Sequence, residues 1–527
     1  MAPVDPLAGL SPVVREWFTT TFAEATPPQA GGWPAISRGE HVLITAPTGS
    51  GKTLAAFLAG RDRLVTDEVP EKDRRCRILY LSPLRALAVA VEKTLRAPRR
   101  GSARAAERRG VDVHEPTGGM RTGDTDQRER QRMVRNPPDL LITTPESLFL
   151  MLTSNARETL RSVDTVIIDE IHAVAATKRG AHLAVSLERL AELTDRPVQR
   201  IGLSATQRPL SEIARFLGGS EAPGEPRPVT IVDEGSRKQL EVEVVVPVED
   251  MASLGEREEE RGGDPTFEPP RSSIWPAIHP RLLELILEHR TTLVFCNSRR
   301  LAERLATRLN ELHVGGENRA GEQDGRSAPD GEELVKAHHG SLSREQRLGL
   351  EDDLKAGRLR ALVATSSLEL GIDMGAVDLV VQVESPGAVS RGLQRIGRAG
   401  HQVGVPSKGS IFPKHRGDLL EAAVVVRRML DGEIEHMHYL RNPLDVLAQQ
   451  IVAMCAVEEW DLDELLGVLR RSAPYAELSE EVAGSVLALL AGRCPSEELG
   501  ARRLRPRDRR ARSSRCPRPA PGRPWPR

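Results

Sequence analysis

The chain has 527 residues, 39% of them hydrophobic and 28% charged, which is the ordinary composition of a soluble globular protein. Its length suffices for three or four domains of about 150 residues each. The net charge is −1 but unevenly placed, because residues 501–527 hold eleven Arg and one Asp and residues 1–500 therefore carry −11. A body with that charge can bind nucleic acid only if its basic groups are gathered in a channel.

The sequence argues against three classes of protein. No stretch approaches about 18 uninterrupted apolar residues, so neither a transmembrane helix nor a membrane partner is expected. The N-terminus lacks the basic and apolar segments of a signal peptide. The five cysteines are scattered and form no C-x-x-C pair, which disfavours a metal cluster or a disulfide framework and fits a cytoplasmic location.

The first informative segment in chain order is APTGSGKT at residues 46–53, which follows an apolar run at 42–44 and precedes a helix-like run at 54–58. Strand, glycine loop and helix are the context of a phosphate-binding loop, in which glycines let successive N–H groups point at a phosphate. Lys52 would reach the β and γ phosphates, and the Thr53 hydroxyl would hold Mg²⁺. The strict pattern begins with Gly where this chain has Ala, and a glycine-rich turn that caps a helix is the alternative interpretation.

Short β-branched runs alternate with helical stretches through much of the chain. Continuous apolar strands separated by helices indicate parallel sheets covered on both faces. We therefore predict an α/β fold with two lobes, residues 1–235 and 276–435, joined by a linker with an acidic loop at 236–275. The expected strands are residues 42–44, 77–81, 140–143, 165–169, 200–203, 291–296, 360–364 and 379–383.

Two polar stretches interrupt this pattern. The linker begins strand-like at residues 242–246 and then becomes acidic and rich in Pro and Gly, which predicts a solvated loop. Residues 314–331 are polar and glycine-rich and predict a surface loop within the second lobe.

An acidic pair, Asp169 and Glu170, follows an apolar run. Two carboxylates at the carboxyl end of a buried strand are costly unless a cation is present. Asp169 would hold Mg²⁺ through water, and Glu170 would orient and polarise an attacking water. An acidic turn after a strand is the alternative, but the phosphate loop some 117 residues upstream favours a Walker-type ATPase.

Two further segments gain meaning in that context. Ser204 and Thr206, in the segment SAT at the end of the next strand, would bond His172 and couple the ATP site to lobe movement. Arg395 and Arg398, in the segment QRIGRAGH, are expected on one helix face, from which arginine fingers reach a γ-phosphate. A solvated basic helix is the alternative.

After residue 440 the apolar residues repeat at helical spacing and predict a third, helical domain at residues 436–500. Residues 501–527 hold Arg and Pro with almost no apolar content, so they cannot bury a core and are expected to be disordered. A basic nucleic-acid tail is one interpretation. We favour another, an out-of-frame terminus that cuts the protein short.

These motifs together resemble those of the superfamily 2 helicases over about residues 10–430, in the family's order. The matching segments are residue 29 (motif Q), 46–53 (I), 82–87 (Ia), 144–148 (Ib), 169–172 (II), 204–206 (III), 293–300 (IV), 364–373 (V) and 394–401 (VI). The amino-acid sequences of several segments are similar to those of the large helicase-related (Lhr) family. Those segments are residues 46–58, 121–125, 337–341 and 442–450.

The resemblance implies two RecA-like lobes, then a winged-helix domain and a further domain. It implies a monomer that uses ATP and Mg²⁺, moves 3′→5′ on single-stranded DNA and unwinds duplexes, including RNA–DNA hybrids. A role in DNA repair is implied more weakly. The Arg/Pro tail begins near residue 494, where the family pattern should continue into the strands of the winged helix, so the third domain is expected to be incomplete.

The resemblance also implies a role for individual residues. The catalytic set is Lys52, Asp169, Glu170, Arg395 and Arg398. Nucleotide contacts are expected from Gln29 (to adenine), Thr48, Gly49, Ser50, Gly51, Lys52, Thr53, Gly371 and Asp373. Contacts to the nucleic-acid backbone are expected from Arg85, Thr144, Ser298, Gly340 and Thr365. Coupling residues are His172, Ser204, Thr206 and Gln394.

The sequence thus predicts an ATP-dependent helicase whose lobes close on ATP, with sequence-tolerant and salt-sensitive binding to the strand. The low aromatic content of 3% argues against broad base-stacking platforms. Two alternatives stay open: a nucleic-acid-stimulated ATPase clamp that does not separate strands, and a non-functional fragment of a longer protein. An RNA helicase also stays open, because the motifs do not separate DNA from RNA.

Overall fold

The computed structural model describes residues 5–47, 49–83, 88, 91, 96–111, 113–205, 207–234, 239–251, 274–324, 333–369, 377–400 and 405–492. They form two compact units, each with its own parallel sheet. The first unit combines the residues up to 46, residues 50–235 and the residues from 436 on; the second combines residues 236–435 with 47–49. In the described part of the chain, none of the helices has the length and hydropathy needed to cross a membrane.

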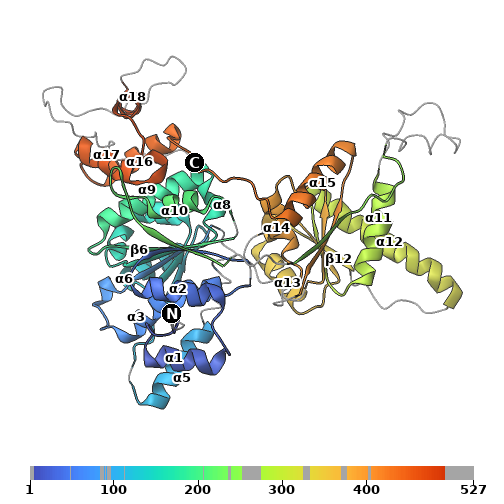
Figure 1. Ribbon diagram of the computed structural model, residues 1–527, viewed down its shortest axis with the longest axis horizontal. Coiled ribbons are helices and arrows are strands. Elements are labelled where there is room, and N and C mark those ends of the chain that lie inside the picture. The colour runs from blue at the N-terminus through green and yellow to red at the C-terminus, as the bar shows by residue number, and fades with distance from the viewer. Residues whose placement is uncertain are drawn as a thin grey trace. The chain divides into compact units, whose positions relative to one another are not determined.

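A seven-stranded parallel sheet forms the centre of the first unit (Figure 1). Five of its strands match the predicted runs, with ends that differ by one residue at most, whereas the two edge strands were not predicted. In spatial order the strands are β3 (Gly118–Arg121), β4 (Leu140–Thr143), β2 (Ile78–Leu81), β5 (Thr165–Ile168), β6 (Gln199–Ser204), β1 (His41–Thr45) and β9 (Val229–Asp233). A separate antiparallel hairpin joins β7 (Ser220–Ala222) and β8 (Glu225–Pro226).

Both faces of this sheet are covered, because successive side chains of a strand point to opposite faces. Val42 and Ile44 of β1 belong to one apolar core and Leu43 to the other. The helices that cover the two faces form two layers, which Figure 1 shows on opposite sides of β6. The first layer contains α1 (Pro12–Thr21), α2 (Pro27–Ser37), α3 (Lys52–Thr66) and α5 (Arg96–Arg109). The second contains α6 (Gln127–Arg135), α7 (Pro145–Leu152), η2 (Asn155–Leu160), α8 (His172–Ala175), α9 (Lys178–Leu193) and α10 (Leu210–Gly218), and η1 (Lys72–Arg74) precedes β2.

The second unit has a six-stranded parallel sheet. In spatial order its strands are β10 (Leu240–Val244), β15 (Ser407–Phe412), β14 (Leu379–Val383), β11 (Thr292–Phe295), β13 (Ala361–Ala364) and β12 (Val335–His338). One face is covered by α11 (Trp275–Glu288) and α12 (Arg299–Asp324). The remaining elements of this unit are α13 (Arg344–Lys355), η3 (Ser366–Leu368), α14 (Val389–Ile396) and α15 (Arg416–Asp431).

The two polar stretches differ from their predictions. Residues 240–244, assigned to the linker, form β10 and pair in register with β15, so the linker contributes a strand to the second sheet. Residues 314–324, assigned to a loop, continue α12, because glycines within a helix lower its stability without preventing it. Within these two stretches, residues 252–273 and 325–331 lie outside the described residues.

The helical segment from residue 444 packs on the first unit. Its helices are α16 (Leu444–Val457), α17 (Leu462–Arg471), η4 (Ala473–Tyr475) and α18 (Glu480–Leu490). Leu447 and Ile451 of α16 share an apolar core with Ala181 and Val185 of α9. The described residues of this segment contain helices and no strand, and the Arg/Pro tail at 501–527 lies outside the described residues.

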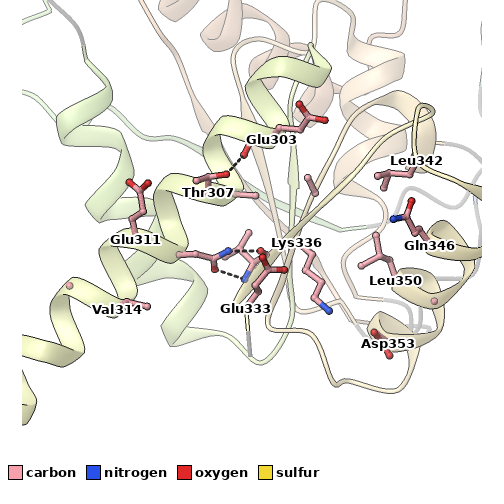
Figure 2. A pocket seen from close by; sticks show the side chains of 16 residues that line it. Glu303, Thr307, Glu311, Val314, Glu333, Lys336, Leu342, Gln346, Leu350 and Asp353 are labelled. Atoms are coloured by element: carbon pink, nitrogen blue, oxygen red, sulfur yellow. Dashed lines mark hydrogen bonds between the residues drawn. The ribbon is translucent and has the colours of Figure 1, made fainter. Parts of the chain in front are cut away.

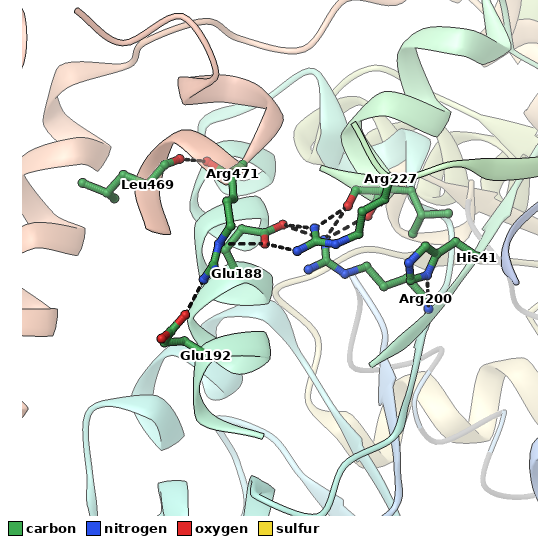
Figure 3. Close-up of polar contacts among 10 residues, drawn as sticks. His41, Glu188, Glu192, Arg200, Arg227, Leu469 and Arg471 are labelled. Carbon is green, nitrogen blue, oxygen red and sulfur yellow. Dashed lines mark hydrogen bonds and ion pairs between the residues drawn. The ribbon is translucent and has the colours of Figure 1, made fainter. Parts of the chain in front are cut away.

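A buried ion cluster around Glu188 of α9 strengthens that junction (Figure 3). The Glu188 carboxylate lies 2.7 Å from Arg200 and 3.0 Å from Arg227, and the Nε of Arg471, from α17, lies 3.8 Å from it. Burial acts to raise the pKa of Glu188, but the Arg200 charge and the hydrogen bonds from Arg200 and Arg227 outweigh it and lower the pKa. The carboxylate therefore compensates buried guanidinium groups at the contact between the sheet, α9 and α17.

Glu188→Gln is expected to destabilise the first unit by about 3–5 kcal/mol, because it leaves the buried Arg200 without a counter-charge. The measurement is the thermal unfolding midpoint. The matched control is Glu192→Gln, whose side chain is 47% exposed and pairs only at the surface with Arg471, so its effect stays below about 1 kcal/mol. Equal midpoints for the two variants would contradict the assigned role of Glu188.

Candidate functional site

The candidate residues of the first unit gather where parallel strands end. The phosphate loop follows β1, the acidic pair follows β5, and the segment SAT begins at the last residue of β6. These three strands are adjacent in the sheet, in the order β5-β6-β1. Because the carboxyl ends of parallel strands meet at one edge, segments more than one hundred residues apart in sequence are brought together there.

The phosphate loop has the backbone that its glycines predict. Gly49 and Gly51 adopt φ values of +83° and +84°, which L-residues rarely occupy. Lys52 is the first residue of α3; it is buried, and its Nζ donates a hydrogen bond to the Ala46 carbonyl. A Cβ at Gly51 would lie 2.6 Å from Gln29 Nε2, so a side chain at this position would have to displace the Gln29 amide.

Gln29, predicted to read adenine, lies against this loop. Its Oε1 accepts a hydrogen bond from the Thr26 N–H at 3.0 Å, and its Nε2 donates to the Gly51 carbonyl at 3.4 Å. The amide is therefore held between the start of α2 and the end of the glycine loop. Adenine contact by Gln29 stays a prediction.

The acidic pair is buried at the end of β5. Asp169 and Glu170 are 6% and 7% exposed. The Tyr80 hydroxyl donates to Asp169 Oδ2, and the Glu170 N–H donates to Asp169 Oδ1 at 3.0 Å. Burial and the neighbouring Glu170 carboxylate raise the pKa of Asp169. Glu170 itself adopts φ +44°, a strained conformation for a non-glycine residue, of the kind that clusters at functional sites.

His172 links the acidic pair to the end of β6, and its coupling role stays a prediction. Its Nδ1 accepts a hydrogen bond from the Ala205 N–H at 3.2 Å and lies 3.2 Å from the Ser204 hydroxyl and 3.5 Å from Glu170 Oε2. Burial lowers the pKa of His172, so the imidazole is neutral near neutral pH. The backbone donor assigns the lone pair to Nδ1 and hence the proton to Nε2.

The residues present fit a magnesium ion held mainly by phosphate. Hard oxygen donors suit Mg²⁺, and this edge offers the Asp169 carboxylate and the Thr53 hydroxyl. Two carboxylates buried side by side are costly without a cation, and the raised pKa of Asp169 reflects that cost. The described residues contain no group of three or more His, Cys, Asp or Glu side chains that could hold a metal, so a bound nucleotide would have to complete the coordination.

The arginine pair of the second unit differs from its prediction. Helix α14 ends at Ile396 and Gly397 caps it, so Arg395 lies on the helix while Arg398 follows it. Both instead converge on Glu369: the Arg395 guanidinium lies 3.0 Å from its carboxylate, and Arg398 Nη2 donates to its carbonyl at 2.8 Å.

Arg395 is enclosed by polar partners. Its guanidinium also donates to Asn297 at 3.0 Å and to Gln382 at 2.8 Å, and it lies over the Phe295 ring, 5.3 Å from the centroid. Burial lowers the pKa of Arg395. Four of its five N–H groups are thus used within the second unit. Arg395 thus supports the second unit in this arrangement, and its role as an arginine finger stays a prediction.

The candidate nucleic-acid contacts of the second unit also follow strand ends. Ser298 follows β11, Gly340 follows β12 and Thr365 follows β13, and these strands are adjacent in the sheet. Ser298 and Gly340 are exposed, and the Ser298 hydroxyl accepts a hydrogen bond from the Leu301 N–H at 3.3 Å. In the first unit, Thr144 is buried and caps α7 by accepting from the Ser147 N–H.

The burial of the remaining predicted residues differs, and some of them lie outside the described part of the chain. Gln394 is half-buried on α14, and Ser50 and Thr53 are half-buried in the phosphate loop and α3. The predicted residues that lie outside the described residues are Thr48, Arg85, Thr206, Gly371 and Asp373. Sequence reasoning missed Tyr80, Glu369, Asn297 and Gln382, whose only sequence signal is that Asn297 and Glu369 fall within matched motif segments.

A cavity of about 1000 Å³ in the second unit is lined by residues other than the predicted site residues (Figure 2). It is lined by α12, β12 and α13, and none of the predicted site residues belongs to its lining. Two of its carboxylates, Glu311 and Asp353, are bound to Arg308 and Arg358. Asn310 closes the edge of β12 beside it, by binding both the N–H and the carbonyl of Val335.

Comparison with known families agrees with this geometry. The profile of the DEAD/DEAH box helicases matches residues 26–213, and that of the helicase conserved C-terminal domain matches 278–402. The winged helix domain of the large helicase-related protein matches residues 427–512, which extends past the predicted domain end at 500. Two RecA-like lobes that carry these motifs define a helicase of the DEAD/DEAH class.

Within that class, the chain belongs to the large helicase-related (Lhr) family. It is 54% identical over 521 residues to an Lhr helicase/probable uracil glycosylase of Mycolicibacterium smegmatis, covering 95% of this chain and 33% of that protein. It is 42% identical to the ATP-dependent helicase Lhr-Core protein 2 of Thermococcus barophilus, covering 92% of this chain and 53% of that protein. The chain thus spans between a third and about half of the length of these relatives.

Solved structures have the same fold. The structure of Mycobacterium smegmatis helicase Lhr bound to ssDNA and AMP-PNP matches with a TM-score of 0.80 and 55% identity, over 93% of this chain and 58% of that one. The DUF1998 helicase MrfA bound to DNA matches with a TM-score of 0.67 at 20% identity, covering 92% of this chain and 61% of that one, which shows likeness of fold alone.

Arg395→Met is expected to destabilise the second unit by about 3–5 kcal/mol, because it removes the buried counter-charge of the Glu369 carboxylate and leaves only the half-exposed Arg391 near it. The matched control is Arg391→Met, since Arg391 is half-exposed and lies 3.5 Å from the same carboxylate. Thermal unfolding of both variants is the measurement. Unfolding of Arg395→Met at the temperature of the native protein would show that the supporting role of Arg395 is wrong.

Proposed function

We propose that this chain is an ATP-dependent translocase and helicase that moves 3′→5′ on single-stranded DNA as a cytoplasmic monomer. Duplex DNA and RNA–DNA hybrids would be its substrates and DNA repair its setting. The observation that carries the proposal is the convergence of Lys52, Asp169 and Glu170 at one edge of the first sheet. The likeness to an Lhr helicase bound to ssDNA and AMP-PNP supports the choice of ligands.

In this proposal the first unit binds the triphosphate of ATP. The N–H groups of the glycine loop and Lys52 face the phosphates, for which Lys52 must leave its hydrogen bond to the Ala46 carbonyl. Mg²⁺, when bound, neutralises charge on the β and γ phosphates and would be held by Thr53 and, through water, by Asp169. Glu170 orients the attacking water and accepts its proton.

The remaining residues connect the acidic pair to β6 and support the second unit. His172 contacts both the acidic pair and the end of β6, so a change at Glu170 reaches Ser204 through one side chain. In the second unit both arginines hold Glu369, Arg395 through its carboxylate and Arg398 through its carbonyl. The arginine fingers that the sequence suggested stay a prediction.

Nucleic acid would bind at the strand ends of both sheets. Thr144, Ser298, Gly340 and Thr365 follow the carboxyl ends of their strands and would contact the phosphodiester backbone. Backbone contacts position a strand without reading its sequence. Binding should therefore be sequence-tolerant and weaken as salt rises, with a logarithmic slope of about −0.7 for each phosphate neutralised on a single strand.

Glu170→Gln is expected to retain ATP binding and to lower ATP turnover by about 10²–10⁴-fold, the usual contribution of a general base. The amide keeps the size of the side chain but cannot accept the proton of the attacking water. Nucleotide affinity and steady-state hydrolysis are measured on the same preparation. Glu477→Gln, on an exposed side chain of the helical segment, is the control for the same chemical change. Hydrolysis by Glu170→Gln at the native rate would refute the assignment.

A second candidate function is an ATPase clamp that binds and moves along a strand without separating duplexes. One observation favours it: the described part of the segment from residue 444 is helical, without the strands of a winged helix.

Hydrolysis with and without single-stranded DNA, followed by duplex displacement at saturating ATP, separates these functions. We expect stimulation by the strand together with displacement of a duplex that carries a 3′ overhang. Stimulated hydrolysis without displacement would favour the clamp. No hydrolysis in either condition would contradict both functions and favour a fragment that depends on further residues for activity.

A further inference from the structure

Tyr80 is a buried polar residue beside the acidic pair that the proposed reaction leaves without a role. It lies in β2, is fully buried, and donates its hydroxyl to Asp169 Oδ2. β2 pairs with β5 so that Tyr80 lies opposite Ile167. Because side chains alternate along a strand, Asp169, two residues after Ile167, faces the same side of the sheet as Tyr80.

The phosphate-loop helix fixes the ring of Tyr80. The ring stacks on Phe57 of α3, with centroids 4.9 Å apart and an interplanar angle of 26°. Phe57 is itself buried and lies five residues after Lys52, on the helix that also carries Thr53. The Tyr80 hydroxyl is therefore positioned by the same helix that presents both phosphate-loop side chains.

The two hydrogen bonds on Asp169 fix the plane of its carboxylate. Oδ2 accepts from Tyr80, and Oδ1 accepts from the Glu170 N–H at 3.0 Å. An ionised carboxylate offers about four lone-pair sites. Each oxygen therefore keeps capacity for a metal-bound water, and the direction of that lone pair is set by the bond already made.

We propose that Tyr80 is a positioning residue, which orients the Asp169 carboxylate for the Mg²⁺ ion that accompanies ATP. The inference rests on the proposed function, because it takes Asp169 as the residue that holds Mg²⁺ through water. Tyr80 touches neither metal nor nucleotide and acts through Asp169 alone. Groups that hydrogen-bond a metal-holding side chain typically change metal affinity or activity 10–100-fold.

Tyr80→Phe removes the hydroxyl and keeps the ring on Phe57. We expect it to raise the Mg²⁺ concentration for half-maximal ATP hydrolysis at least about tenfold. Direct binding of a fluorescent ATP analogue gives a second readout: affinity in EDTA stays unchanged, while the gain on adding Mg²⁺ shrinks by a similar factor. An Mg²⁺ dependence like that of the native protein in both assays would overturn the proposal.

Tyr475→Phe is the matched control. Tyr475 is also fully buried and donates its hydroxyl to the Pro443 carbonyl at 2.7 Å, within the helical segment. This variant loses a buried hydrogen bond of the same kind and should keep the native Mg²⁺ dependence. A shift of equal size in both variants would mean that loss of stability, and not orientation of Asp169, is being measured, and would overturn the proposal.

Asp169→Asn separates failure of this inference from failure of the proposed function. If Asp169→Asn leaves the Mg²⁺ dependence unchanged, the assignment of Asp169 fails and Tyr80 loses its role with it. If Asp169→Asn raises the Mg²⁺ requirement and Tyr80→Phe does not, the inference about Tyr80 alone is wrong.

A spectroscopic measurement avoids removing the hydroxyl. The chain has only three tyrosines, Tyr80, Tyr439 and Tyr475. The double variant Tyr439→Phe, Tyr475→Phe, produced with 3-fluorotyrosine, therefore carries the label at Tyr80 alone. We expect its fluorine resonance to move when Mg²⁺ is added to the nucleotide-bound protein. A resonance that responds to nucleotide but not to Mg²⁺ would overturn the proposal.

Discussion

The common direction of the strands in each sheet is the constraint on which the candidate site depends. In a parallel sheet all carboxyl ends lie at one edge, and Thr45, Ile168 and Ser204 end three neighbouring strands of the first sheet. The segments that follow bring together a lysine, two carboxylates and a neutral histidine. The second sheet obeys the same rule for Ser298, Gly340 and Thr365. Strand direction thus decides which residues meet, and local contacts decide how each one is held.

Much of this arrangement could be predicted from the sequence, because buried parallel strands and glycine loops have direct sequence signals. Residues 140–143 and 379–383 are mainly apolar runs, and they form β4 and β14 with the predicted bounds. The phosphate loop carries its signal in glycines, and Gly49 and Gly51 adopt the positive φ that explains them. The contact between His172 and Ser204 was predicted from the position of the segment SAT at the end of the next strand.

The rest could not be predicted, because it depends on partners brought from distant parts of the chain. Arg395 is bound by Asn297 and Glu369, which lie 98 and 26 residues away in the sequence. Spacing alone placed Arg395 and Arg398 on one helix face, but Gly397 ends α14 between them. Two of the edge strands lack apolar runs: β3 begins with two glycines, and β12 contains Lys336 and His338. An edge strand is recognised by the neighbour it pairs with, and that neighbour is known only once the sheet has formed.

The first unit is discontinuous in sequence, since the chain leaves it after residue 235 and returns at 436. Helix α9 therefore emerges from the ribosome about 250 residues before α16, whose Leu447 and Ile451 cover Ala181 and Val185. At roughly 5–20 residues per second, that apolar face waits on the order of ten seconds to a minute for its cover. During this interval Arg189 also lacks Gln450, which accepts its hydrogen bond in the finished protein. Nascent chains of this protein thus expose an apolar helix surface during that interval, and transiently exposed surfaces of this kind make folding intermediates prone to aggregation.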